Sequence, residues 1–316
     1  IQEVIKKQIA VGFTSFINKK YKLTTMVNLT LVVFAFFIFQ LPLYAETNNE
    51  IKQPDFAYPQ TVIENAEVLL DKASNERNSI DMVKAILQIV IAKNQISKSN
   101  VTEMLHLIDS VAKTQQTDFR AILHSIEAEL YYSIYINNRY LYDQRNVSQI
   151  DFPTDPTLWD KDIFALKINE LVMKSLSETD SLLNSPITNY SEILVDLTED
   201  CIIFYPTLYD LLAYRGLSML SEFSSDTEVI PFFSYQGKKT TQEQTKDSIT
   251  NIITTLKTMH WKRNEIAPYI EAVINTKVEY NSNLKGYREY LVEEFESNNK
   301  SEYSIELLLQ LVQLTD

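Results

Sequence analysis

The residues best suited to hold a metal ion are the histidines, and the sequence has three: His106, His124 and His260. None belongs to a His-Glu-x-x-His motif, and the single cysteine, Cys201, rules out any Cys-x-x-Cys pair. His124 and Glu127 would share one face of a helix, but a protein metal site needs three or four converging ligands. We therefore interpret the histidines as surface or hydrogen-bonded core residues, and we predict neither a metal site nor another cofactor.

The sequence likewise gives little evidence for a catalytic nucleophile. The sequence has no Gly-x-Ser-x-Gly segment, and its four glycines form no Gly-rich phosphate loop. Cys201 precedes three large apolar residues, which favours burial of an unreactive thiol. Acidic pairs such as Glu127/Glu129 and Glu293/Glu294 are weak evidence for glycosidase chemistry, because a charge-rich helical surface produces them by chance. We predict no catalytic residue and no enzyme.

A cluster of aromatic residues is the remaining candidate for a binding site. Five tyrosines and two arginines gather near the end of one predicted helix: Tyr131, Tyr132, Tyr135, Tyr140, Tyr142, Arg139 and Arg145. Tyrosine and arginine are enriched among the residues that dominate protein interfaces. Tyr131 and Tyr135 are one helical turn apart, however, and packing between helices with the hydroxyls at the rim is the simpler interpretation. We retain Tyr131, Arg139 and Tyr140 as possible interaction residues.

Composition narrows the class of partner. The 42 acidic and 29 basic residues give a net charge of -13, and such a chain repels phosphate backbones, so no nucleic-acid partner is predicted. Hydrophobic residues make up 45% and charged residues 22%, which is typical of a globular chain. With one cysteine no intramolecular disulfide can form, so the fold must be stabilised by its core.

The N-terminal region has the order of a secretory signal peptide. Lysines precede Met26, residues 29–41 form an apolar run, Pro42 breaks it, and Ala45 suits the position before a cleavage site. The run is shorter than the ~20 residues that span a bilayer, and an uncleaved membrane anchor is the alternative. We interpret 1–25 as an upstream extension or n-region and 26–45 as the signal peptide. The chain is then exported to the periplasm or the outer-membrane surface, and touches a membrane only through this segment.

The rest of the chain has the spacing of amphipathic helices. Thr61 and Asn100 begin capping boxes, and Ser79 can cap a further helix. Helices are also predicted at 101–112, 118–138, 160–183, 191–197, 207–220, 242–259, 265–280, 284–295 and 303–314. Short polar turns between such helices predict an all-α fold of stacked antiparallel hairpins, similar to tetratricopeptide (TPR) repeats or an α-solenoid, although no strict 34-residue period occurs. We assign 46–225 to a helical domain, 226–241 to a connector and 242–316 to further hairpins.

Three segments carry a resemblance: residues 121–132 with 138–140, residues 155–160, and residues 205–215. In this order and spacing they resemble the N-terminal helical region of large bacterial alpha-2-macroglobulin-like proteins. The third segment, Tyr-Pro-Thr-Leu-Tyr-Asp-Leu-Leu-Ala-Tyr-Arg, is the most specific, and the resemblance extends over 60–225. The matching residues include Trp159, Asp160, Tyr205, Pro206, Tyr209, Asp210 and Arg215.

The resemblance implies an exported protease-trapping protein. Such proteins trap proteases through a bait segment, and many carry a thioester built on a Cys-x-Glu-Gln motif. Cys201 is followed by Ile202 and Ile203, so we assign no thioester residue, and no bait residue either. The resemblance therefore implies a non-catalytic N-terminal part of such an inhibitor, either as a fragment or as a diverged stand-alone relative.

The matching residues have structural interpretations. Pro206 suits the first turn of a helix, where its missing N–H costs nothing. Trp159 beside Asp160 can staple a helix start onto its neighbour. We expect Arg215 to pair with Asp210 or with an adjacent helix.

The leading hypothesis is thus a helical scaffold whose partner is protein, either the remaining macroglobulin domains or another envelope protein. A stand-alone TPR-like adaptor that binds a protein or peptide is the alternative. A glycan-binding protein on a helical scaffold is a third possibility, disfavoured because the chain has only 2 tryptophans.

Overall fold

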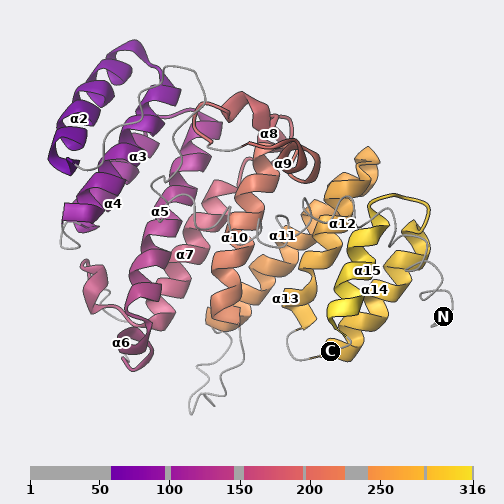
Figure 1. Ribbon diagram of the computed structural model, residues 1–316. Helices are drawn as coiled ribbons and strands as arrows, with labels where there is room; N and C mark the ends of the chain where they lie inside the picture. Colours follow the sequence, from indigo (N-terminus) through magenta and orange to yellow (C-terminus); the bar gives the residue numbers. More distant parts are fainter. Residues whose placement is uncertain are drawn as a thin grey trace. The chain divides into compact units, whose positions relative to one another are not determined.

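A computed structural model describes residues 58–96, 101–145, 153–194, 197–224, 241–280 and 283–314 (Figure 1). The predicted upstream extension at 1–25 and signal peptide at 26–45 lie outside these residues. The predicted connector at 226–241 also lies outside them, except for Thr241, which begins a helix.

The described residues are helical, with no strand among them, as the all-α prediction required. The longer helices are α2 (Pro59–Glu76), α3 (Ser79–Ile96), α4 (Val101–Ala112), α5 (Thr117–Asn137), α7 (Lys161–Ser175), α10 (Leu208–Ser224), α11 (Thr241–Arg263), α12 (Ile266–Asn275), α14 (Leu284–Asn298) and α15 (Ser304–Gln313). Short elements are α6 (Arg139–Asp143), η2 (Pro156–Leu158), α8 (Thr179–Leu183), η3 (Ile187–Tyr190), α9 (Glu199–Phe204) and α13 (Lys277–Tyr280). A single isolated β-bridge among the described residues joins Pro186 to Thr207.

Two predicted helix caps are wrong, one by three residues and one by a single residue. Helix α2 begins at Pro59, and Thr61 does not cap it. Proline is favoured in the first turn because its missing N–H would have no partner there. Helix α3 is capped by Asn78 rather than Ser79: the Asn78 side-chain oxygen accepts the backbone N–H of Asp81 at 3.2 Å.

Three predicted helices take a different form. The described residues of the predicted helix at 191–197, which are 191–194 and 197, are not helical: η3 ends just before them, and α9 starts at Glu199 with Thr198 as its cap. The helix predicted over 160–183 is divided into α7 and α8. The hydroxyls of Ser177 and Thr179 bond to the carbonyls of residues 174 and 176 at the break, as side chains that compete with helical bonding do. The helix predicted over 265–280 is likewise divided, into α12 and α13.

Helices that are near one another in the sequence contact one another in space. Pairs include α2 with α3, α4 with α5, α5 with α7, α10 with α11, α11 with α12, and α14 with α15. Helix α7 also packs against α10, so α5, α7 and α10 lie side by side in Figure 1. At this contact Gly216 leaves no room for a side chain, because a Cβ there would stand 2.5 Å from the Cγ1 of Val172.

Apolar side chains form two cores. The larger core draws on helices from α3 to α12, and the predicted inner face of α5 contributes Ile122, Leu123, Ile126, Leu130 and Tyr135. The smaller core joins α12, α14 and α15 through Ile270, Tyr287, Leu291 and Leu307. Several polar residues singled out by the sequence are buried among these helices, including Asp160, Asp210 and Arg215.

Candidate functional site

Trp159 and Asp160 fix the start of α7. The Asp160 side chain accepts the backbone N–H of Ile163 at 2.9 Å, which caps the helix. Trp159, just before the cap, packs edge-on against Phe164 at 5.1 Å, the arrangement of a hydrophobic staple. Its ring also stacks on Tyr131 of α5 at 5.1 Å, and its ring N–H donates to the carbonyl of Pro153 at 2.6 Å. These residues therefore dock α7 onto α5.

Thr207 and Asp210 form a capping box at the start of α10. The Asp210 Oδ2 accepts the backbone N–H and the hydroxyl of Thr207 at 2.9 and 2.7 Å, and the Thr207 oxygen accepts the N–H of Asp210. Pro206 therefore precedes the cap, and its predicted place in the first turn is wrong. Its carbonyl instead accepts the N–H of Ile187, so this proline pairs the entry of α10 with η3.

The same aspartate is part of a buried array that the sequence interpretation missed. The Nε2 of His260 in α11 lies 2.7 Å from Asp210 Oδ1, and its Nδ1 lies 2.7 Å from Glu265 Oε2. The side chains of His260 and Asp210 are both 0% exposed. Burial alone lowers the pKa of His260, but hydrogen bonds and charge attraction from Asp210 and Glu265 outweigh it and raise the pKa above its ordinary value.

Local geometry at the end of α11 brings Glu265 to the histidine. Asn264 takes the left-handed conformation (φ 56°), and the N–H of Glu265 bonds to the carbonyl of His260 at 3.0 Å. A second bond, from the N–H of Asn264 to the carbonyl of Trp261, completes a Schellman motif. The turn thus places the carboxylate beside the ring five residues earlier.

Arg215 pairs with Glu129 of α5 and not with Asp210. Both side chains are largely buried, and burial lowers the pKa of Arg215 to about 10. The alternative that we expected, a neighbouring helix, is therefore the partner. The pair ties α10 to α5 across 86 residues of sequence.

Tyr205 and Tyr209 are also interior residues. The Tyr205 hydroxyl donates to Glu271 of α12 at 3.3 Å, and its pKa is raised well above the ordinary value by burial and by that carboxylate. Burial likewise raises the pKa of Tyr209 to about 12. Glu271 in turn has its own pKa raised by burial, and it acts on Glu306 of α15, whose pKa is raised to about 7 mainly by burial.

The tyrosine cluster divides into buried and exposed members. Tyr131, Tyr135 and Tyr142 are buried, and the Tyr135 hydroxyl donates to Asp143 at 2.7 Å. Tyr140 is 80% exposed. Packing is thus the correct interpretation for most of the cluster, and Tyr140 is the exception.

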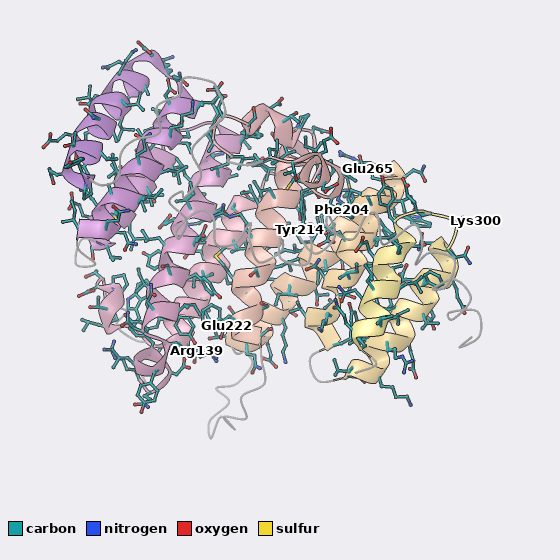
Figure 2. All side chains as sticks on the ribbon, viewed as in Figure 1. Arg139, Phe204, Tyr214, Glu222, Glu265 and Lys300 are labelled. Atoms are coloured by element: carbon teal, nitrogen blue, oxygen red, sulfur yellow. The ribbon has the colours of Figure 1, made fainter. Side chains whose placement is uncertain are left out.

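Arg139 is tied to the protein beside Tyr140. Its guanidinium contacts Asp143 at 3.3 Å and Glu222 of α10 at 2.5 Å. Arg139 and Glu222 are labelled in Figure 2. The charge of Arg139 is therefore already paired, so Arg139 holds α6 against α10.

Exposed apolar side chains lie on α6, which carries Tyr140, and on α5 and η2, where α5 contacts both α6 and η2. Ile136, Leu141 and Leu158 are 39%, 49% and 55% exposed, and they come from α5, α6 and η2. Arg145 joins the end of α6 to η2 through hydrogen bonds to the carbonyls of Thr157 and Trp159. We refer to Ile136, Tyr140, Leu141 and Leu158 as the Tyr140 corner.

The other chemical candidates remain isolated. His124 Nδ1 lies 3.8 Å from Glu127 Oε2, and neither atom has a hydrogen-bond partner. Across the described ranges no three His, Cys, Asp or Glu side chains converge as metal ligands would. Cys201 is buried, as predicted. Of the helices described, none combines the length and apolarity needed to cross a membrane.

Comparisons with known protein families, with characterised proteins and with solved structures find no match for this chain.

Proposed function

We propose that this chain is a non-catalytic helical scaffold, the N-terminal arm of an exported alpha-2-macroglobulin-like protease inhibitor, without the bait and thioester regions. Its helices would form stacked antiparallel hairpins of the TPR or α-solenoid kind. The observation that carries this proposal is the use of the motif residues. Asp160 caps α7, and Asp210 and Arg215 bond side chains of other helices, so these residues support helix docking.

The buried array of His260 has the residue types of a catalytic relay but not its access. A general base must come within hydrogen-bond reach of the proton that it abstracts. Both ring nitrogens of His260 already face carboxylates at 2.7 Å, and the ring is 0% exposed. This geometry favours a structural role.

A scaffold needs a surface that binds its partner, and the Tyr140 corner is the best candidate. Exposed tyrosine with neighbouring aliphatic side chains offers a large apolar area and one hydroxyl, the combination that anchors protein interfaces. The partner is protein, either the β-rich domains of a macroglobulin-like protein or another envelope protein. The same corner also fits the alternative, a stand-alone TPR-like adaptor.

Fractionation of native cells tests export and assembly together. We expect the tagged protein in the periplasm or on the outer membrane, with a mature N-terminus near Glu46, in a complex containing macroglobulin-like domains. A periplasmic complex that lacks such domains would favour the adaptor. A protein that stays in the cytosol with residues 26–45 intact would contradict both.

A further inference from the structure

The geometry around His260 favours two ring protons. Asp210 Oδ1 and Glu265 Oε2 each lie 2.7 Å from one ring nitrogen, and a carboxylate oxygen can only accept. A neutral imidazole has one N–H, so one of the two contacts would set a ring lone pair against a carboxylate oxygen. The imidazolium satisfies both contacts.

This array lies at the junction of the two cores. Asp210 and His260 belong to α10 and α11, which contribute to the larger core, whereas Glu265 precedes α12, which contributes Ile270 and Val273 to the smaller core. Polar ties across the junction include Tyr205 to Glu271 at 3.3 Å and Lys257 to the Tyr290 hydroxyl at 2.5 Å. Aromatic packing also crosses it, because the Trp261 ring of α11 lies 5.2 Å from the Tyr269 ring of α12.

We propose that His260 is a proton-dependent latch: its imidazolium clamps α12, and with it the α14–α15 pair, onto α10 and α11, and loss of the ring proton loosens this C-terminal layer. Deprotonation leaves a buried ring nitrogen opposed to a carboxylate, which destabilises the clamped state. Glu265 is half-buried, so the proton has a route to water on that side.

Other charged groups on the neighbouring elements are engaged elsewhere. Arg263 donates to the Leu183 carbonyl and the Asn184 side chain, and Lys257 approaches Glu294 at 4.0 Å. On α13, Lys277 and Glu279 are exposed. On α7, Lys167 and Lys174 both pair with Glu170, and Asp162 lies beside Asp160 at the helix start. The ring is thus left to Asp210 and Glu265.

Linkage gives the direction of the effect. The folded-state pKa of His260 is raised above 6.5, so its contribution is complete below pH 6.5 and is lost as the pH rises toward the folded-state pKa. Glu306 affects stability over a lower range of pH. Because burial raises its pKa from 4.5 to about 7, its ionisation destabilises the folded state between those values. Both groups therefore stabilise the packing of the C-terminal layer as the pH falls.

Hydrogen exchange on the full chain tests the latch. We expect amide protection factors in α12, α14 and α15 to fall about ten-fold per pH unit above pH 6.5, until the folded-state pKa is reached. H260Q, which keeps one hydrogen bond but no titration, should lower protection and remove this slope. H106Q, at an exposed histidine, should leave the slope unchanged, and E306Q should flatten only the window below pH 7.

A spectroscopic measurement keeps the proposal testable if H260Q does not fold. The ring nitrogen chemical shifts of His260 in the wild-type protein should titrate with a midpoint above pH 6.5. A midpoint at or below pH 6.5 would overturn the proposal. So would protection factors in α12 that follow the same pH course in H260Q as in the wild type.

Discussion

Replacing Gly216 with alanine should destabilise the protein, although alanine is the better helix former. In the middle of α10 the change gains about 1 kcal/mol of helix propensity. The new methyl group would stand 2.5 Å from Val172 Cγ1, closer than any ordinary contact. Valine cannot rotate away, because its χ1 angle is nearly fixed in a helix. Overpacking of this kind costs about 1–3 kcal/mol, so we expect a net loss of about 1 kcal/mol.

In a V172A background, the effect of G216A on stability should change sign. V172A removes two methyl groups from the core and should cost about 1.6 kcal/mol or more by lost burial. In that background the methyl group added at position 216 fills vacated space, and G216A should become stabilising by about 1 kcal/mol. Urea unfolding of the wild type, both single variants and the double variant measures the four free energies of unfolding. If G216A stabilises the protein in both backgrounds, the close contact between α7 and α10 is refuted.

Three other substitutions test one tie between helices and two helix ends, each by urea unfolding. E129A leaves Arg215 buried without the Glu129 carboxylate and should lower the free energy of unfolding by about 3 kcal/mol. The double variant E129A/R215M should lose less stability than E129A alone. Equal losses would show that the Glu129–Arg215 pair does not stabilise the protein. D160A should cost about 1 kcal/mol through loss of the α7 cap, and D155A, which caps only the three-residue η2, serves as the control that should cost less. R77G should stabilise the protein by about 1 kcal/mol because Arg77 has φ 55° at the end of α2, and a loss of stability would contradict this assignment of strain.

Local patterns in the sequence predict the helices better than their ends. The inner face of α5 follows the 3.6-residue period, and Ile122, Ile126 and Leu130 are buried accordingly. The cap of α7 is visible because Asp160, a residue type favoured at helix starts, stands three and four residues before the apolar Ile163 and Phe164. By contrast, Ser191 looked like a helix start, but η3 and the Thr198 cap shift the next helix to Glu199.

The buried array could not be predicted because its members are far apart in sequence. Asp210 and His260 are separated by 50 residues, and only the packing of α10 against α11 brings them together. Thr207 and Asp210 have the Thr-x-x-Asp spacing of a capping box. The predicted helix nevertheless starts at residue 207, one residue before the observed start at Leu208, because Pro206 is assigned to the first turn. Whether a side chain is exposed also depends on residues far away in the sequence. Tyr135 and Tyr140 both belong to the tyrosine cluster, but the surrounding helices bury Tyr135 and leave Tyr140 80% exposed.

Site-specific photo-crosslinking at Tyr140 tests the central claim, that this scaffold binds a protein at the Tyr140 corner. A photoreactive phenylalanine analogue replaces Tyr140 in native cells, and the same analogue at Val68, which is 70% exposed on α2, is the matched control. The account predicts one covalent adduct, specific to position 140, with an exported protein or with macroglobulin-like domains. Equal adducts from both positions, or none from position 140, would contradict it.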